Sequence, residues 1–507
     1  MADGQEPRRA TYPKNTGRAL LWTIGSAVLP GIAHLRMRRW WAGGIILAVS
    51  VLLLATGIAG ALILGSDMLR SAAYIVQGRW LLTASAVAFA LTVLWMTVVV
   101  HSWAITRPPA AGRLARFSAG TVVLVMCVAM AVPAAAVIRT SYTAYDTLSS
   151  VFNSALGGEP HDAADPWAGR DRVNVLLLGG DSGSNRYGMR TDSMMVASID
   201  VEHGDVVLIG LPRNLENAPF PEGSALAEQY PAPTGFTDLL NEVYQTVAED
   251  PGRLAIDPDA TDPAADTLKS VIGGATGVEL DYYALVDMEG FEGLIDAIGG
   301  IDVHIEDPIP YGQEGGVLEA GDQHLNGNEA LWYGRSRVNS DDYARMGRQG
   351  CLIKYVAEQA DPMSVLTGFQ DLAGATERTL RTDIPQSKLP AFIELADLVG
   401  DEGEMRTLQL SPPQIDTAYP DWEEIKGLIA AAVQEQEDAQ ETAPKDGLAV
   451  EPSPSPGQQP QPGGLAAGDD VADSTEWQEY TGLPDPSPTT EGRQVGSDAG
   501  SLDALCP

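Results

Sequence analysis

The sequence predicts an α/β domain with α-β-α layers, preceded by an N-terminal transmembrane region made of several helices. Long apolar stretches are concentrated before about residue 138. Residues 172–435 instead alternate between short apolar runs rich in β-branched residues and segments with helical spacing of apolar positions, as layered α/β domains do. Residues 436–507 are rich in Pro, Gly, Asp, Gln and Ser, a composition that predicts a disordered tail.

Four apolar stretches occupy the membrane region, at residues 19–35, 41–64, 80–103 and 117–137. The last three are long enough to cross a hydrocarbon core of about 30 Å as helices. The first is interrupted by Pro30 and Gly31, so it is either a fourth span or a re-entrant hairpin that turns at this pair. We expect the hairpin, because it keeps the basic tail at residues 1–18 in the cytoplasm.

Basic residues predict how this region is oriented. The loops that follow the first and third stretches carry three arginines each: Arg36, Arg38, Arg39, Arg107, Arg113 and Arg116. Loops rich in Lys and Arg stay inside the cell, so the final span runs outward. We therefore assign residues 19–137 to three or four membrane segments, 138–171 to a linker and 172–435 to an extracytoplasmic domain of a multi-pass protein of the cell membrane.

The domain opens with three apolar runs that predict buried strands, at residues 173–178, 194–199 and 206–211. Helical patterns at 239–247 and 266–272 precede a further strand at 282–286. An amphipathic helix at 291–298 ends at Gly299 and Gly300, and a strand follows at 301–305. The last predicted helices are 328–333 and 341–359.

The net charge of −36 argues against nucleic acid as a partner, since binding its phosphates requires many Lys and Arg on one face. The six histidines show no ligand spacing for a His-based metal site. In so acidic a chain, clustered arginines are conspicuous, and six of them lie in or next to the ends of predicted elements: Arg190, Arg213, Arg335, Arg337, Arg345 and Arg348.

These arginines predict an anion site, because a guanidinium stays charged and pairs with phosphate oxygens through two parallel hydrogen bonds. Surface salt bridges explain any one of them equally well, but not all six together. Two carboxylates, Asp181 and Asp192, flank the loop at 182–191 beside Arg190. Such a pair suits Mg²⁺ that also bridges to phosphates, although capping of the loop by these residues is an alternative.

Several motifs, in this order, resemble the LytR-CpsA-Psr family. They are VNVLLLGGDSGSNRYGMR at 173–190, TDSMMVASID at 191–200, IGLPRN at 209–214, LNEVY at 240–244, YYALVDMEGFEGLIDAIGGIDV at 282–303 and LNGNEALWYGRSRVNSDDYARMGRQ at 325–349. Cys351 and the multi-span N-terminus resemble the actinobacterial branch. Two positions depart from the family pattern, Asn214 in place of Asp and Leu240 in place of Lys, and both remove a charged group.

The resemblance implies an α-β-α domain that binds a polyprenyl-pyrophosphate-linked glycan and transfers it, with Mg²⁺, to a hydroxyl on peptidoglycan or a cell-surface protein. Asp181 and Asp192 would hold the metal, and Asp342 or Asp341 would orient or deprotonate the acceptor. The pyrophosphate would be contacted by Arg190, Arg213, Arg335, Arg337, Arg345, Arg348 and Gln349. There are two alternatives. The protein could be a pyrophosphatase that uses water as acceptor, or a non-catalytic sensor or regulator.

We also predict a disulfide between Cys351 and Cys506, because both cysteines fall on the side expected to be oxidising. Cys127, inside an apolar stretch, should stay a free thiol. Intact-mass measurement after thiol alkylation checks this pairing. Without reductant, neither Cys351 nor Cys506 should be alkylated, whereas alkylation of both would show that the bridge is absent.

Overall fold

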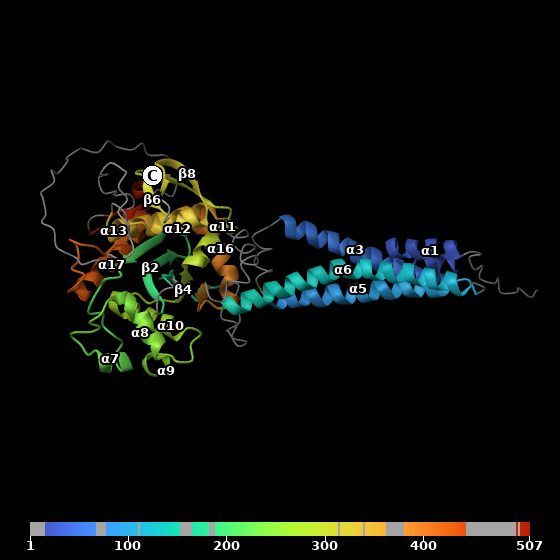
Figure 1. Cartoon of the computed structure of the whole chain (residues 1–507), viewed down its shortest axis with the longest axis horizontal. Helices are drawn as coiled ribbons and strands as arrows, with labels where there is room; N and C mark the ends of the chain where they lie inside the picture. Colours follow the sequence, from blue (N-terminus) through green and yellow to red (C-terminus); the bar gives the residue numbers. More distant parts are fainter. Residues whose placement is uncertain are drawn as a thin grey trace, which may run out of the picture. The chain divides into compact units, whose positions relative to one another are not determined.

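The computed structural model describes residues 16–66, 78–109, 112–152, 165–181, 188–312, 315–337, 340–360, 380–442, 493–494 and 497–506. Most of the predicted cytoplasmic tail, part of the loop between Asp181 and Asp192, and most of the predicted disordered tail lie outside these residues. The chain forms two compact units (Figure 1). One comprises Met1–Gly169 and Ala360–Asp397, and the other comprises Arg170–Gln359 and Leu398–Pro507.

The first unit is a bundle of helices. Its members are α1 (Thr16–Val28), α2 (Ile32–Arg36), α3 (Trp40–Ser66), α5 (Gly78–Thr106) and α6 (Arg113–Val151). Among the described residues, three helical segments are long and apolar enough to cross a membrane: Trp40–Leu62, Trp80–Thr106 and Arg113–Asp146. The unit also holds β9 (Leu380–Thr382), η2 (Gln386–Lys388) and most of α16 (Leu389–Asp401).

The first apolar stretch is broken where the sequence predicts a break. At 1.5 Å per residue, the 13 residues of α1 span about 20 Å, less than the roughly 30 Å of a hydrocarbon core. Gly31 then adopts a φ of 98°. A Cβ atom at Gly31 would lie 2.6 Å from the carbonyl oxygen of Gly43, so the turn also packs tightly against α3. The chain therefore reverses direction between α1 and α2 at a position that requires glycine.

The last long helix extends further than the sequence predicts. Residues 138–151, assigned to a linker, continue α6 as far as Val151. This segment contains no Gly or Pro, so nothing in its sequence ends the helix. The preceding Pro133 lies inside α6 without terminating it.

The second unit is built on a mixed sheet whose strands lie in the order β11-β10-β3-β2-β1-β4. Their bounds are β1 (Arg172–Asp181), β2 (Arg190–Asp200), β3 (Val206–Leu211), β4 (Tyr282–Asp287), β10 (Met405–Gln409) and β11 (Gly500–Ser501). The pairs β1–β4 and β3–β10 are parallel, and the other neighbours in this order are antiparallel.

Helices cover both faces of this sheet, which confirms the predicted α-β-α layers (Figure 1). One face packs against η1 (Leu240–Glu242), α8 (Val243–Glu249), α10 (Pro263–Thr276) and α17 (Trp422–Thr442). The other packs against α11 (Met288–Ala297), α12 (Gly327–Arg335), α13 (Asp342–Gln359) and α18 (Leu502–Leu505). In β3, Val207 and Ile209 point into the first core and Val206 and Leu208 into the second. Because both faces are buried, β3 is apolar at successive positions instead of alternating.

Short elements complete the unit. They are α7 (Ala225–Gln229), α9 (Pro251–Leu254), and two antiparallel ribbons formed by β5 (Ile301–Ile305) with β8 (Gly321–Leu325) and β6 (Ile309–Tyr311) with β7 (Gly316–Leu318). The predicted helix stop before β5 is confirmed, since Gly299 and Gly300 both have positive φ, at 91° and 93°.

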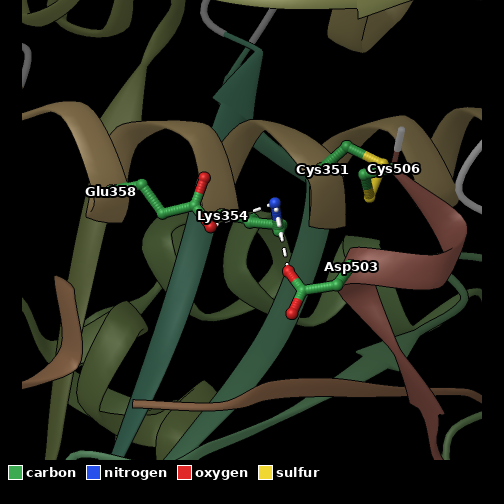
Figure 2. Close-up of a disulfide and its surroundings, with 5 residues drawn as sticks. All are labelled: Cys351, Lys354, Glu358, Asp503 and Cys506. Atoms are coloured by element: carbon green, nitrogen blue, oxygen red, sulfur yellow. Dashed lines mark ion pairs between the residues drawn. A yellow bond between two sulfur atoms is a disulfide. The ribbon is translucent and has the colours of Figure 1, made fainter. Parts of the chain in front are cut away.

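The end of the chain folds back onto this unit. Leu502 is fully buried in the core between the sheet and α13, and β11 pairs with β10. The predicted disulfide is confirmed by an S–S contact of 2.07 Å between Cys351 and Cys506 (Figure 2). The segment predicted as a disordered tail is thus structured at its two described ends, because α17 also continues to Thr442.

The β5–β8 ribbon provides a pH-dependent contact. His324 Nδ1 lies 2.7 Å from Asp302 Oδ1, and Nε2 lies 3.0 Å from the carbonyl oxygen of Gly299. The bond to Asp302, followed by that to Gly299, raises the pKa of the imidazole above its usual value. Its charged form therefore stabilises the ribbon below the ordinary pKa, and this contribution is lost as pH rises through the raised value.

We expect Asp302→Asn to lower the pKa of His324 toward the ordinary value of about 6.5, as measured by NMR titration of the imidazole. Asp322→Asn is the matched control, because Asp322 pairs with His304 on the same ribbon. A titration midpoint of His324 that Asp302→Asn leaves unchanged, or that both variants shift equally, would contradict the contact.

Candidate functional site

Asp342, the first residue of α13, lies among three arginines from three segments of the chain. Arg345 holds it by two hydrogen bonds, Nε to Oδ1 and Nη2 to Oδ2, each 3.1 Å. Arg337 Nε is 3.1 Å from Oδ1, and Arg213 Nε is 3.5 Å from Oδ2. Burial alone would raise the pKa of Asp342, but Arg345, Arg213 and Arg337 outweigh that effect and hold the pKa below its usual value. The carboxylate is therefore ionised at neutral pH.

Asp192 joins this cluster because of a β-bulge. The register of β1 and β2 shifts between Gly179 and Gly180, so that Asp192 is the extra residue on β2. Its Oδ1 accepts hydrogen bonds from Arg213 Nη1 at 3.3 Å and from Asn241 Nδ2 at 2.8 Å. Bulges redirect a side chain in this way at the end of a ladder, often beside a functional site.

Arg345 ties the two carboxylates together. Besides binding Asp342, its Nη1 donates to the main-chain oxygen of Asp192 at 3.1 Å. Its side chain is almost fully buried, with a residue exposure of 3%. This guanidinium therefore links α13 to β2.

Arg190 occupies the neighbouring end of β2. It lies opposite Asp181 in the β1–β2 ladder. Its Nη2 is 3.1 Å from Glu242 Oε1, and its Nε donates to Gln245 Oε1 at 3.3 Å. The sequence-predicted residues Arg190, Asp181 and Asp192 therefore share the same end of the β1–β2 pair, next to η1 and α8.

The side chains near Asp192 suit a hard cation. Within the described ranges, no group of three or more His, Cys, Asp and Glu residues is arranged to hold a metal. However, two buried oxygen atoms beside Asp192, Thr191 Oγ1 and Asn241 Oδ1, have no hydrogen-bond partner among the described residues. An oxygen-only set with one or two carboxylates is the donor chemistry of Mg²⁺ that also binds substrate phosphates.

Arg348, Arg335 and Gln349 surround the end of α12. Arg348 is fully buried and donates to the carbonyl oxygens of Tyr333, at 2.8 Å, and Ser336. Gln349 donates to the Gly334 carbonyl at 3.1 Å and accepts from Ser193 Oγ at 2.9 Å. Arg335 lies over the ring of Trp332, 4.9 Å from its centroid. These three fix the segment that leads into Arg337, and a contact with a ligand remains a prediction for each.

Asp341 precedes α13 and acts as its cap. Its Oδ1 accepts from the main-chain N–H of Ala344 at 2.7 Å, and its Oδ2 lies 2.8 Å from Arg493 Nη1. The sequence predicted a role for Asp341 but not for Arg493, which no motif marks. Asn241 and Gln245 were not predicted as site residues either. Asn241 lies inside the LNEVY motif, and the place of that motif in the ordered series could have indicated it.

Comparison with known protein families identifies the chain. The LytR_cpsA_psr family matches residues 138–437, more than half of the chain. The chain belongs to the LytR-CpsA-Psr family, as the motifs predict.

The chain is similar in sequence to named relatives and in structure to solved proteins. A Bacillus anthracis protein named polyisoprenyl-teichoic acid–peptidoglycan teichoic acid transferase TagU is 26% identical over 239 residues, 47% of this chain and 67% of the relative. The protein of the same name from Halalkalibacterium halodurans is 24% identical over 229 residues, 45% and 66% of the two chains. The crystal structure of B. subtilis TagV is 20% identical with a TM-score of 0.38, over 53% of this chain and 98% of that chain.

Asp342→Asn should lower the free energy of unfolding by about 1–3 kcal/mol, because it leaves the buried Arg345 without an anionic partner. The folded-state pKa of Asp342 is lowered, so its contribution is present above the ordinary Asp value of about 3.9 and is lost as pH falls through the lowered value. The difference between wild type and variant should be largest near neutral pH and should shrink below about pH 4.

Denaturant unfolding followed by tryptophan fluorescence at pH 7 and pH 3 measures this difference. Asp503→Asn is the control, since it removes a more exposed ion pair with Lys354 on the same helix. Equal stability of wild type and Asp342→Asn at pH 7 would show that the arginines do not depend on Asp342.

Proposed function

We propose that this protein is a membrane-anchored phosphotransferase that moves a glycopolymer from a polyprenyl-pyrophosphate carrier to an acceptor hydroxyl on peptidoglycan or a surface protein. The observation that carries the proposal is the convergence of Arg213, Arg337 and Arg345 beside Asp192 and Asp342. Relatives in the same family are named as transferases of teichoic acid to peptidoglycan. Their shared family supports the reaction class, and the glycan here is left open.

The arginines suit a pyrophosphate. Each guanidinium has five N–H donors, and Arg213 and Arg337 use few of them on Asp192 and Asp342. Both are also partly exposed, at 29% and 44% of their side chains, so a ligand can reach them. Charge neutralisation of the phosphoryl oxygens supplies much of the catalysis in phosphoryl transfer.

A divalent cation, Mg²⁺, would be held by Asp181 and Asp192, with Thr191 and Asn241 as neutral oxygen neighbours. It would neutralise further charge on the phosphoryl oxygens. Arg213 also binds Asp192 and thereby keeps that carboxylate oriented toward the site.

The transfer itself exchanges one bond to phosphorus for another. The acceptor oxygen bonds to the phosphorus that carries the glycan, and the bond from that phosphorus to the bridging oxygen breaks. Polyprenyl phosphate leaves, and the hydroxyl proton passes to a carboxylate or to water. Because the pKa of Asp342 is lowered, Asp342 is a weak base and better suited to orient the acceptor than to deprotonate it. Asp341 is the other candidate for either role.

The proposed location is the outer surface of the cell membrane. The three apolar helical segments are long enough to span, and Arg36, Arg38 and Arg39 precede the first of them. Counting positive charges inside sends the end of α6 outward, together with the domain that follows. The disulfide between Cys351 and Cys506 supports the same side, since disulfides persist in oxidising compartments.

The reaction is tested with the full chain in lipid nanodiscs, a polyprenyl-pyrophosphate-linked glycan, Mg²⁺ and peptidoglycan fragments. Glycan covalently attached to the fragments supports the transferase. Free glycan phosphate that forms at the same rate with and without fragments would instead favour the pyrophosphatase. Absence of turnover with retained binding of the lipid would favour the sensor.

Asp181→Ala and Asp192→Ala should each lower Mg²⁺-dependent turnover by two or more orders of magnitude, because a lost metal ligand costs far more than a lost loop contact. The rate of glycan transfer at saturating Mg²⁺ measures the effect. Circular dichroism provides the control for folding. Near-normal turnover in both variants would rule out the metal assignment.

Arg345→Lys should lower the same rate nearly as much as Arg345→Ala. An ammonium group cannot make the two parallel bonds to Asp342 and the third to the Asp192 carbonyl. Recovery of most activity with lysine would mean that Arg345 acts only as a point charge.

A further inference from the structure

The C-terminal segment brings a further charged group, Arg493, to the rim of the arginine cluster. Residues 497–506 are attached to the domain by the Cys351–Cys506 disulfide, which Figure 2 shows. Pairing of β11 with β10 and the buried Leu502 also attach them. Asp503 of this segment also pairs with Lys354 of α13, at 3.2 Å. The segment is therefore anchored to α13 and to the sheet at several separate points.

Gln494 is a further point of attachment, and it lies near the start of α13. Its side chain is buried; Oε1 accepts from the main-chain N–H of Gln409 at 2.9 Å and Nε2 donates to the Asp498 carbonyl at 2.7 Å. Gln409 is the last residue of β10. The preceding residue, Arg493, is thereby held at the end of the sheet where α13 begins.

Arg493 pairs with Asp341. Its Nη1 is 2.8 Å from Asp341 Oδ2, and its guanidinium lies over the ring of Tyr343, 5.9 Å from the centroid. The other oxygen of Asp341 is already bound to the N–H of Ala344. Both carboxylate oxygens thus have a donor, and one of the two comes from the far end of the chain.

Two adjacent carboxylates, Asp341 and Asp342, lie at the start of α13, and different arginines neutralise them. Asp342 has three arginines, whereas Arg493 is the ion-pair partner of Asp341 among the described residues. Without Arg493, the negative charge of Asp341 would lie uncompensated one residue from Asp342, at the edge of the proposed anion site. Such a charge repels an anionic ligand, and its effect is screened by salt.

We propose that Arg493 is a positioning residue of this site: it neutralises and orients Asp341, so that the C-terminal segment, tethered by its disulfide, completes the anion site. This inference rests on the proposed function for the identity of the anion, a pyrophosphate group. Arg493 acts through Asp341 and makes no contact of its own with the reacting atoms.

The test measures binding of inorganic pyrophosphate to the full chain in nanodiscs by titration calorimetry. Arg493→Ala should weaken binding about three- to five-fold, the scale of a partly exposed ion pair. Asp341→Asn in the same background should restore most of the affinity, because it removes the uncompensated charge. Arg493→Lys should bind nearly as the wild type does, since one hydrogen bond and a charge are all that the pair requires.

A separate variant tests the disulfide that holds the C-terminal segment. Cys506→Ser should weaken pyrophosphate binding by no more than Arg493→Ala does, because β11, Leu502 and Gln494 also hold the segment, and the double variant should show no further loss beyond Arg493→Ala. Asp503→Asn is the matched control, because it removes another ion pair between the C-terminal segment and α13 that is remote from Asp341, and it should leave binding unchanged. Raising ionic strength should narrow the gap between wild type and Arg493→Ala.

The outcomes separate this inference from the proposed function. If Arg345→Ala abolishes binding while Arg493→Ala leaves it unchanged, the anion site stands and the role of Arg493 is wrong. If Arg493→Ala weakens binding but Asp341→Asn does not rescue it, Arg493 does not act through Asp341, and the inference is again overturned. If neither arginine matters to binding, the anion site itself is wrong.

Discussion

The site depends on the repulsion among three guanidinium groups and on the carboxylates that offset it. Two like charges 4 Å apart repel by about 4 kcal/mol at the effective dielectric constant of a protein surface. Arg213, Arg337 and Arg345 approach one another because each pairs with Asp342, and Arg213 also pairs with Asp192. The repulsion among the arginines is offset before any anionic ligand binds. The cluster is therefore formed in advance and is not assembled by the ligand.

The fold makes this convergence possible because it brings the ends of three secondary-structure elements to one place. Arg213 follows β3, Arg337 follows α12, and Arg345 lies in the first turn of α13. The bulge after Gly179 then directs Asp192 toward Arg213. The strands of the sheet are packed on both faces at the density of a molecular crystal, so their ends have little freedom to move.

The sequence was sufficient for elements with strong periodicity and insufficient for short ones. The strands 206–211 and 301–305 were predicted with their observed bounds, because continuous or alternating apolar patterns fix them. The three-residue strands β6 and β7 are too short to show a period, so they were not predicted. Pairing of β10 with β11 joins segments about 95 residues apart, and local patterns contain no such information.

Helical spacing also could not assign separate roles to neighbouring arginines. Arg345 and Arg348 share one face of α13 by their i, i+3 spacing, and the sequence predicts the same role, contact with a pyrophosphate, for both. Both are buried, yet Arg345 binds a carboxylate while Arg348 binds the main-chain carbonyls that end α12. Asp342 lies on the same helix as Arg345, whereas the partners of Arg348 depend on the position of α12, which is a long-range property of the fold.

The disulfide also decides how this domain would carry a mechanical load. The bond from Cys506 to Cys351 spans a sequence separation of 155. A pull applied to the chain beyond Cys506 therefore passes through the disulfide into α13 and bypasses β10, α16 and α17. The intervening polypeptide bears tension only if the bridge is opened. In mechanical terms the load enters the domain at the middle of α13, the helix that also carries Arg345.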